Sequence, residues 1–268
     1  MKLNTQIHGS GFPILCLHGH PGSAESLSVF TQPLSQRFQT IAPDLRGYGK
    51  SQWDRPFDMA DHIDDLVKLL DQHQIKECLV LGWSLGGILA FELALRLPER
   101  ITGLILIATS VNPVSDHPAI TWEDYLYTGA ASILNWLWPG WSVNIELFGK
   151  RSLYRHLIQQ HTAVAYQYLA KAGLPAYFQT SNAATNALRK ALQERYDRRH
   201  DLPNIQCPSL VLIGECDRHI IPSTSLAMAQ TLQACTWHVY PHTAHLFPWE
   251  IPEQVIADIN QWLQTNGY

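Results

Sequence analysis

Charged side chains are scarce in this sequence. Lys, Arg, Asp and Glu make up 16% of the 268 residues, whereas typical soluble domains contain about 25%. The net charge is −4, and no basic run exceeds a pair such as Arg198-Arg199, so nothing should attract the chain to nucleic acid or anionic lipid. A small neutral or apolar molecule is the expected partner, with no nucleic acid and no membrane. The oligomeric state stays open.

Long hydrophobic runs and a disulfide pattern are also missing. No apolar run approaches the roughly 18 residues of a membrane span, and the opening MKLNTQIHGSGFPILCLHG lacks the pattern of a signal peptide. The five cysteines are an odd number, and Cys16, Cys78 and Cys235 lie in or beside apolar runs. Buried free thiols in a reducing compartment explain this usage best. We therefore expect a cytoplasmic protein.

Cofactor motifs are absent as well. The sequence contains neither the G-x-x-x-x-G-K-[ST] pattern that cradles phosphates nor the dinucleotide-binding pattern G-x-G-x-x-G. Its His, Cys, Asp and Glu residues show no metal-ligand spacing. We expect neither a cofactor nor a metal ion.

Apolar residues, in contrast, are plentiful. Hydrophobic residues make up 46% of the chain, with 9 Trp, 10 Tyr and 8 Phe. Short apolar runs with the length and continuity of strands buried on both faces of a parallel sheet are 14-ILCL-17, 79-LVLG-82, 104-LILIA-108 and 210-LVLIG-214. Helical patterns occupy residues 61–73 and 85–97 and the stretch from Pro252 to about Leu263. This alternation predicts an α/β fold with a doubly wound, mostly parallel sheet.

The alternation stops between residues 113 and 202. No buried strand pattern occurs there, and the stretch holds four Trp, seven Tyr and two Phe, nearly half of all aromatic residues. We expect an inserted set of helices over the C-terminal edge of the sheet, where open α/β sheets bind their ligands. The predicted domains are a core of residues 1–112 and 203–268 and a helical cap of residues 113–202.

The strongest local motif is Gly82-Trp83-Ser84-Leu85-Gly86, which lies between a predicted strand and a predicted helix. This context matches a nucleophile elbow, a sharp turn that lifts a serine hydroxyl clear of the sheet. The chain passes so close to itself there that the residues two before and two after the serine need almost no side chain, and both are glycine. The helix that follows directs its N-terminal N–H groups at charge developing nearby. Ser84 is the predicted nucleophile.

A nucleophilic serine needs a base. Of the 13 histidines, the best placed are His245 and His242, which follow the strand-like residues 236–240. His245 is preferred because the apolar Ala244 and Leu246 flank it, as suits an imidazole at the lip of a dry pocket. His242 then reads as a surface turn residue.

The base needs an acid that orients it, and a strand's C-terminal end is where a carboxylate can reach an imidazole N–H. Asp217 stands just after the fourth apolar run. Glu215 in the same loop and Asp116 after the preceding strand are its rivals. We predict that Ser84, Asp217 and His245 form a catalytic triad.

Two main-chain N–H groups should bind the oxyanion that forms during acyl transfer. The segment 17-LHGHPGS-23 follows the first apolar run and so ends at the same sheet edge as Ser84. We predict that the N–H groups of His20 and Leu85 form this oxyanion hole, while His18 braces the loop.

Aromatic residues are the candidates for substrate binding. Trp83 lies beside the serine, and Trp136 and Trp138 of the insertion are predicted to line the pocket, with packing inside the cap as their alternative role. Acidic residues of the insertion could instead hold a substrate ammonium group or simply face solvent; these are Glu123, Asp124 and Glu146.

Together these motifs resemble the α/β-hydrolase superfamily over nearly the whole chain. The matching segments are His18-Gly19 in LHGHPG, DLRGYGKS at 44–51, the elbow around Ser84, GECD ending at Asp217, and AHLFPWEIPE containing His245. The chain order Ser, acid, His is that of this superfamily. The resemblance implies an eight-stranded-type sheet with a helical cap, and a 44–51 loop that braces the rim of the pocket.

Finer resemblances point to two activities. GWSLGG is similar to carboxylesterases that cleave acyl-carrier methyl esters, whereas HGHPG resembles the HGGPG of proline iminopeptidases. It also resembles the HGxP of epoxide hydrolases and dehalogenases, but those enzymes use an Asp nucleophile where this chain has Ser84. We expect a serine hydrolase that cleaves a small carboxylic ester through an acyl-enzyme. An iminopeptidase-like enzyme is the alternative, and a hydrolase-fold ligand receptor is the third hypothesis.

Overall fold

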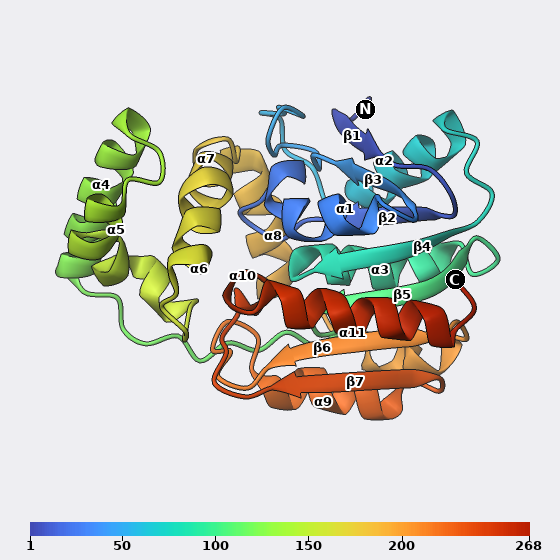
Figure 1. The fold of residues 1–268 in the computed structure, drawn as a ribbon. Coiled ribbons are helices and arrows are strands. Elements are labelled where there is room, and N and C mark those ends of the chain that lie inside the picture. The colour runs from blue at the N-terminus through green and yellow to red at the C-terminus, as the bar shows by residue number, and fades with distance from the viewer.

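A single sheet of seven strands organises the protein (Figure 1), and the computed structural model describes all 268 residues. The strand order is β1-β3-β2-β4-β5-β6-β7, and every neighbouring pair is parallel except β1 with β3 at one edge. The predicted mostly parallel sheet is confirmed, with seven strands in place of the eight that the resemblance implied. The strands are β1 (Thr5–His8), β2 (Pro13–Leu17), β3 (Gln39–Pro43), β4 (Cys78–Trp83), β5 (Ile101–Ile107), β6 (Ser209–Gly214) and β7 (Cys235–Tyr240).

Helices cover both faces of this sheet, as the predicted double winding requires. One face packs against α2 (Met59–Gln72), α3 (Leu85–Arg96) and α9 (Pro222–Thr231). The other face packs against α1 (Ser28–Leu34) and α11 (Pro252–Thr265), which lie in front of the strands in Figure 1. A one-turn 3-10 helix, η1 (Ala24–Leu27), leads into α1, and the short α10 (Phe247–Glu250) precedes α11.

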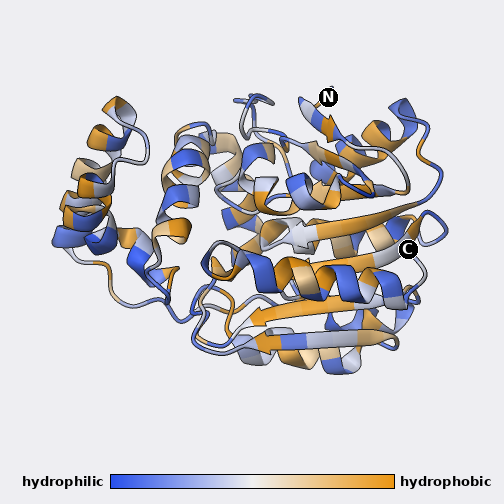
Figure 2. Cartoon of the chain, viewed as in Figure 1, coloured by the Kyte–Doolittle hydropathy of each residue, from blue (hydrophilic) through white to orange (hydrophobic).

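The central strands carry the core because they are buried on both sides. Every residue of β4 and β6 is buried, so Val80 contacts one helical layer while Leu79 and Leu81 contact the other. Figure 2 shows the central strands as mainly apolar ribbons between helices whose outer faces are largely polar. Full burial of one such aliphatic side chain stabilises the fold by about 1.5–3 kcal/mol. The continuous apolar runs of the sequence therefore become the innermost layer.

The connection from β5 to β6 contains helices and loops but no strand, and we call its residues 113–202 the helical segment. Figure 1 shows it beyond the C-terminal ends of the strands, where α6 packs against α10 and α8 against α2. Its elements are α4 (Trp122–Leu137), α5 (Ser142–Leu147), η2 (Gly149–Arg151), η3 (Leu153–His156), α6 (Ala163–Tyr168), η4 (Leu169–Gly173, a π-helix), α7 (Leu174–Phe178) and α8 (Asn182–Gln193), with η5 (Arg199–Asn204) leading back to β6.

The strand order changes direction between β2 and β4. From β2 the chain moves to β3 on one side and then returns to β4 on the other. A crevice outside the C-terminal ends of the strands forms at such a switch point, and ligands bind there in open α/β sheets. The loop after β2 and the turn after β4 meet at this crevice. No helix has the length and apolarity that crossing a membrane would need.

Candidate active site

The turn after β4 holds Ser84 in a strained backbone conformation. Its φ is 54°, in the left-handed region that L residues seldom adopt. A Cβ at Gly82 would collide with the main chain of Gly86, and a Cβ at Gly86 would collide with the carbonyl oxygen of Leu17. Both glycines are therefore required by close approach of the chain, as the motif predicts.

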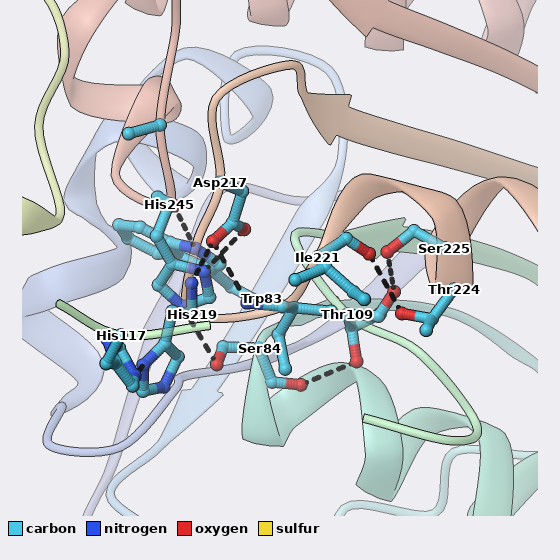
Figure 3. A network of polar contacts seen from close by, with 12 residues as sticks. Trp83, Ser84, Thr109, His117, Asp217, His219, Ile221, Thr224, Ser225 and His245 are labelled. Carbon is cyan, nitrogen blue, oxygen red and sulfur yellow. Dashed lines mark hydrogen bonds and ion pairs between the residues drawn. The ribbon is translucent and has the colours of Figure 1, made fainter. Parts of the chain in front are cut away.

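Neighbouring strands hold this turn in place. The Ser84 N–H donates to the Ile107 carbonyl at 2.9 Å, and the Ser84 carbonyl accepts a 2.8 Å hydrogen bond from the Thr109 hydroxyl. The Thr109 carbonyl in turn accepts one from the Ser225 hydroxyl at 2.8 Å, as Figure 3 shows. These bonds offset the strain at Ser84 and fix where its side chain points.

The structure brings Ser84, His245 and Asp217 into one hydrogen-bonded chain (Figure 3). His245 Nε2 lies 3.0 Å from Ser84 Oγ, and His245 Nδ1 lies 2.8 Å from Asp217 Oδ2. All three side chains are buried. With Nδ1–H donating to the carboxylate, Nε2 is left free to accept the serine proton.

Two main-chain groups hold the other oxygen of the Asp217 carboxylate. Asp217 Oδ1 accepts hydrogen bonds from the N–H of His219 at 2.7 Å and from the N–H of Ile220 at 3.0 Å. The carboxylate thus has a single orientation toward His245. Its sequence rivals lie elsewhere: Glu215 accepts from the His242 N–H, and the exposed Asp116 pairs with Arg218.

The groups predicted for the oxyanion hole lie beside Ser84. Leu85 begins α3, so its N–H belongs to the first turn, where no carbonyl four residues earlier in the helix can accept it. The His20 N–H has no acceptor within the chain. A Cβ built on the adjacent Gly19 would lie 3.1 Å from Ser84 Cβ, which shows how closely this loop approaches the serine.

A cavity opens over Ser84 and His245. It holds about 710 Å³ of empty space including its mouth. The core supplies Trp83, Leu246 and Trp249, and the helical segment supplies Tyr154, Leu157 and Leu169. The lining contains no Asp, Glu, Lys or Arg. The cavity is therefore a mainly apolar chamber with a serine hydroxyl at its wall.

Of the three tryptophans predicted to bind substrate, only Trp83 lines this cavity. Its ring packs edge-on against Trp249, and its Nε1–H donates to the His245 carbonyl at 3.4 Å. The prediction for Trp136 and Trp138 is wrong, because these side chains are 80% and 57% exposed and do not reach the cavity. They lie at the C-terminal end of α4, whose buried face carries other residues.

His219 is a cavity residue that the sequence analysis missed. Its ring lies 4.5 Å from the ring of His245, centroid to centroid, and its Nδ1 is 2.8 Å from Nε2 of His117. Burial, reinforced by the nearby His245, holds the pKa of His219 well below its usual range. The His219 ring is therefore a neutral hydrogen-bonding group at physiological pH. The position of His219 two residues after the predicted acid was the available signal.

Glu250 is a second missed residue, and it joins the core to the helical segment. One carboxylate oxygen accepts the Ala244 N–H at 2.9 Å, beside His245. The other accepts the N–H groups of Gln159 at 3.2 Å and Gln160 at 2.6 Å. Burial raises the pKa of Glu250 despite these bonds. The AHLFPWEIPE motif contains this residue, but sequence alone does not reveal which groups it binds.

His18 braces the loop after β2, in agreement with its predicted role. Its Nδ1–H donates to the Gly19 carbonyl at 2.8 Å, and its Nε2 accepts the Leu45 N–H at 3.1 Å. Burial lowers the pKa of His18 to about 4, so the ring stays neutral. His20 reaches the 44–51 loop differently, through a 2.9 Å hydrogen bond to the Tyr48 hydroxyl.

Comparisons with known proteins agree with this architecture. The family model described as alpha/beta hydrolase fold matches residues 13–252. A pimeloyl-[acyl-carrier protein] methyl ester esterase of Nitrosospira multiformis is 27% identical over 97% of both chains. A 2-hydroxymuconate semialdehyde hydrolase of Pseudomonas putida is 28% identical over 91% of this chain and 84% of that protein.

A solved structure extends the likeness to three dimensions. The thermophilic esterase of Thermogutta terrifontis superposes with a TM-score of 0.69 and 28% identity, covering 99% of this chain and 94% of that one. The fold, the matched region and the relatives lead to the same conclusion, and they confirm the prediction of an enzyme. The chain belongs to the alpha/beta hydrolase fold family.

Proposed function

We propose that the protein is a serine hydrolase that cleaves a small carboxylic ester. One observation carries the proposal: the hydrogen-bonded chain of Ser84, His245 and Asp217 ends at the wall of an apolar cavity. The activities in the names of the relatives, an ester esterase and a semialdehyde hydrolase, agree with hydrolytic chemistry. Hydrolysis of esters is the reaction that this arrangement suits best.

In the proposed mechanism, Ser84 Oγ attacks the ester carbonyl while His245 Nε2 takes its proton. Asp217 holds the imidazole in the required tautomer and stabilises its positive charge. The N–H groups of His20 and Leu85 bind the oxyanion, and the loss of one such donor costs about 3–4 kcal/mol in transition-state stabilisation. His245 then protonates the leaving alcohol. It next activates a water molecule that cleaves the acyl-enzyme and restores the Ser84 hydroxyl.

The cavity indicates the kind of ester. Trp83, Leu157 and Leu169 are among its walls, and no charged side chain faces it. Burial lowers the pKa of His20 to about 4, so this wall residue is neutral too. An uncharged, apolar acyl group fits such a lining, because a charged group would lose its hydration without gaining a partner. We infer that the helical segment acts as a cap that selects this group.

The iminopeptidase-like alternative needs a carboxylate near Ser84 to bind the substrate ammonium. The acidic residues considered for that role point elsewhere. Asp124 pairs with Arg155 and Glu146 with Lys150, while Glu123 is exposed. None of the three lines the cavity. This observation favours the ester over the aminoacyl substrate.

A substrate panel tests the proposal. We expect wild type to hydrolyse p-nitrophenyl butyrate faster than proline p-nitroanilide, and Ser84→Ala to lose at least about 10⁴-fold in kcat because the nucleophile is gone. The exposed Ser223→Ala is the matched control and should retain full activity. Faster cleavage of the anilide would support the peptidase, and retained ester turnover in Ser84→Ala would remove the proposed nucleophile.

The receptor hypothesis predicts a lower turnover rate than the enzyme hypothesis does. A receptor binds its ligand tightly and turns it over slowly, whereas turnover above about 1 s⁻¹ lies in the usual range for enzymes. Multiple-turnover kinetics on the best ester of the panel separate the two. A single slow turnover followed by retention of product would favour the receptor.

A further inference from the structure

Helix α4 presents large apolar side chains to solvent. Trp122 is 72% exposed and Ile133 is 64% exposed, and Tyr125, Leu126, Trp136 and Leu137 are exposed as well. At about 100° per residue these six side chains fall within roughly one third of the helix circumference. Figure 1 places α4 at the border of the molecule on the side away from the sheet. We call these six residues, together with Gly129 between them, the α4 stripe.

Polar contacts on the opposite side fix the rotation of α4. Asp124 is buried and pairs with Arg155 at 2.8 Å. Asn135 donates to the Ala170 carbonyl at 2.8 Å and accepts the Gly140 N–H at 2.9 Å. Turning the stripe inward would break these bonds and leave buried polar groups unpaired, at a cost of about 1–3 kcal/mol each. The helix is thus held with its polar face inside and its apolar face outside.

The exposed apolar area is larger than a monomer usually tolerates. An aromatic side chain offers about 150–250 Å², so the exposed parts of Trp122, Tyr125 and Trp136 alone amount to about 400 Å². Leu126, Ile133 and Leu137 enlarge this area, and the Trp138–Trp141 pair extends it beyond the end of the helix. The total approaches the ~800 Å² that each partner buries in a standard stable interface.

The charges of α4 argue against an anionic lipid surface as the occupant. Helices that lie on such membranes carry Lys and Arg on their polar face. The α4 sequence WEDYLYTGAASILNWL contains two acidic residues and no basic one. A neutral apolar surface that matches this stripe is therefore the better partner.

A second copy of the chain offers such a surface, because the residues of the stripe are spaced almost symmetrically about Gly129. Trp122 and Trp136 stand seven residues before and after Gly129, and Leu126 and Ile133 stand three before and four after it. Gly129 has open space around its Cβ position, so two helices can approach closely there. We propose that the protein forms a two-fold symmetric dimer in which antiparallel α4 helices cross at Gly129. Trp122 of each copy then packs beside Trp136 of the partner, as an isologous interface requires.

The oligomeric state of the full chain tests the dimer. We expect sedimentation and light scattering to report a dimer at protein concentrations of about 10–100 μM. Trp136→Glu should raise the dissociation constant of the dimer at least ~30-fold, the effect of losing an interface hot spot. Trp237 lies on β7, outside the α4 stripe, and is 42% exposed, so Trp237→Glu is the control and should stay dimeric. Unchanged unfolding of Trp136→Glu shows that the loss lies in association.

Cysteine cross-linking tests the antiparallel register. A mixture of Leu126→Cys and Ile133→Cys should yield a disulfide-linked dimer under mild oxidation, while each variant alone should yield little, because a disulfide needs Cα atoms within about 7 Å. Glu123→Cys, off the stripe on the same helix, controls for random oxidation and for the native thiols. Equal cross-linking in all samples would overturn the register.

Two results would overturn the dimer itself. One is a wild-type monomer at the highest concentration. The other is a monomer that binds phosphatidylglycerol vesicles and loses this binding with Trp136→Glu, since the stripe would then face a lipid surface. Neither result bears on hydrolysis, because the stripe residues lie outside the cavity.

Discussion

The sheet and helix α4 of the helical segment bury different kinds of side chains. Every residue of β4 and β6 is buried, and the side chains between these strands and their helices are mainly aliphatic. In α4 the buried residues are Asp124, Ala131 and Asn135, while the large apolar ones face outward. The sheet is therefore stabilised by apolar burial, which grows with area. Helix α4 depends more on hydrogen bonds, each with a net value of about 1 kcal/mol.

The two regions also contribute different parts of the candidate site: the core holds the reacting groups, and the helical segment encloses the cavity. Ser84, Asp217 and His245 stand at the ends of core strands, where packing holds their geometry. Residues of the helical segment such as Leu157 and Leu169 close the cavity from the other side. Few buried apolar contacts, as in α4, are typical of regions that open first. We expect the segment to control access and the core to control the rate of the chemical step.

The largest effect should come from the core acid. Asp217→Asn should lower kcat on p-nitrophenyl butyrate by about 10⁴-fold, because the amide favours the wrong tautomer of His245. Steady-state kinetics measure this loss, and the melting temperature should change little. Asp116→Asn, in the exposed rival, is the control. If Asp116→Asn caused the large loss, the assignment of the acid would be wrong.

The next effect should come from the link between the two regions. In Glu250→Gln the amide NH₂ must face at least one of the N–H groups that the carboxylate now accepts, from Ala244, Gln159 and Gln160. We expect a loss of about 1–3 kcal/mol in the free energy of unfolding, with a lower kcat as the His245 loop loosens. Denaturant unfolding and kinetics measure both. Glu253→Gln, exposed three residues later, should alter neither.

The preferred length of the acyl group should respond to substitutions in the helical segment that line the cavity. Leu169→Ala enlarges the cavity, so longer acyl groups should fit better. The ratio of kcat/KM for p-nitrophenyl octanoate to that for the butyrate should rise by about 10-fold, because one methylene group in an apolar pocket changes kcat/KM by at least about this factor. Trp136→Ala, on the outer face of the same segment, should leave the ratio unchanged. A change of this ratio in Trp136→Ala would mean that Trp136 contacts the substrate after all.

The smallest effect concerns a buried histidine of the core. His62 packs against Tyr48 and Phe57, and neither ring nitrogen has a hydrogen-bond partner. Burial lowers its pKa from 6.5 to about 3. Below pH 6.5 the unfolded chain takes up a proton that the folded protein refuses, so this group reduces stability as the pH falls toward 3.

His62→Leu removes both penalties. We expect the variant to be more stable than wild type by about 1 kcal/mol at pH 7, from the loss of an unpaired buried polar group. The advantage should widen on going to pH 4, as urea unfolding at several pH values can measure. The exposed His73→Leu is the control. A constant difference across this pH range would show that His62 is protonated in the folded protein.

Sequence reasoning worked best where local pattern decides structure. Residues 79–82 and 210–214 have unbroken apolarity, and they form β4 and β6. It missed β1 and β3, because Thr5–His8 and Gln39–Pro43 are short, and polar residues interrupt them. These strands exist because they pair in register with each other and with β2.

The candidate site likewise has features that follow from local sequence and features that depend on long-range contacts. Gly82 reveals the turn around Ser84 because its close approach to Gly86, four residues later, is a local property, whereas Gly86 is also required by the distant Leu17. The hydrogen bond between His245 and Ser84 joins residues 161 positions apart, so local pattern does not determine it. The prediction of His245 as the base rested on chain order and on its apolar neighbours. His219 and Glu250 escaped notice because their roles depend on contacts with distant loops.

By itself, the sequence determined the elbow, the alternation of strands and helices, and the helical character of residues 113–202, since these follow from short-range sterics and periodicity. Only the tertiary structure decided which face of α4 is buried. Aromatic composition suggested that Trp136 and Trp138 turn toward the substrate, but Asp124 and Asn135 find partners inside the segment and turn them outward. A buried polar group must be paired, and that requirement outweighed the preference of the tryptophans for the interior.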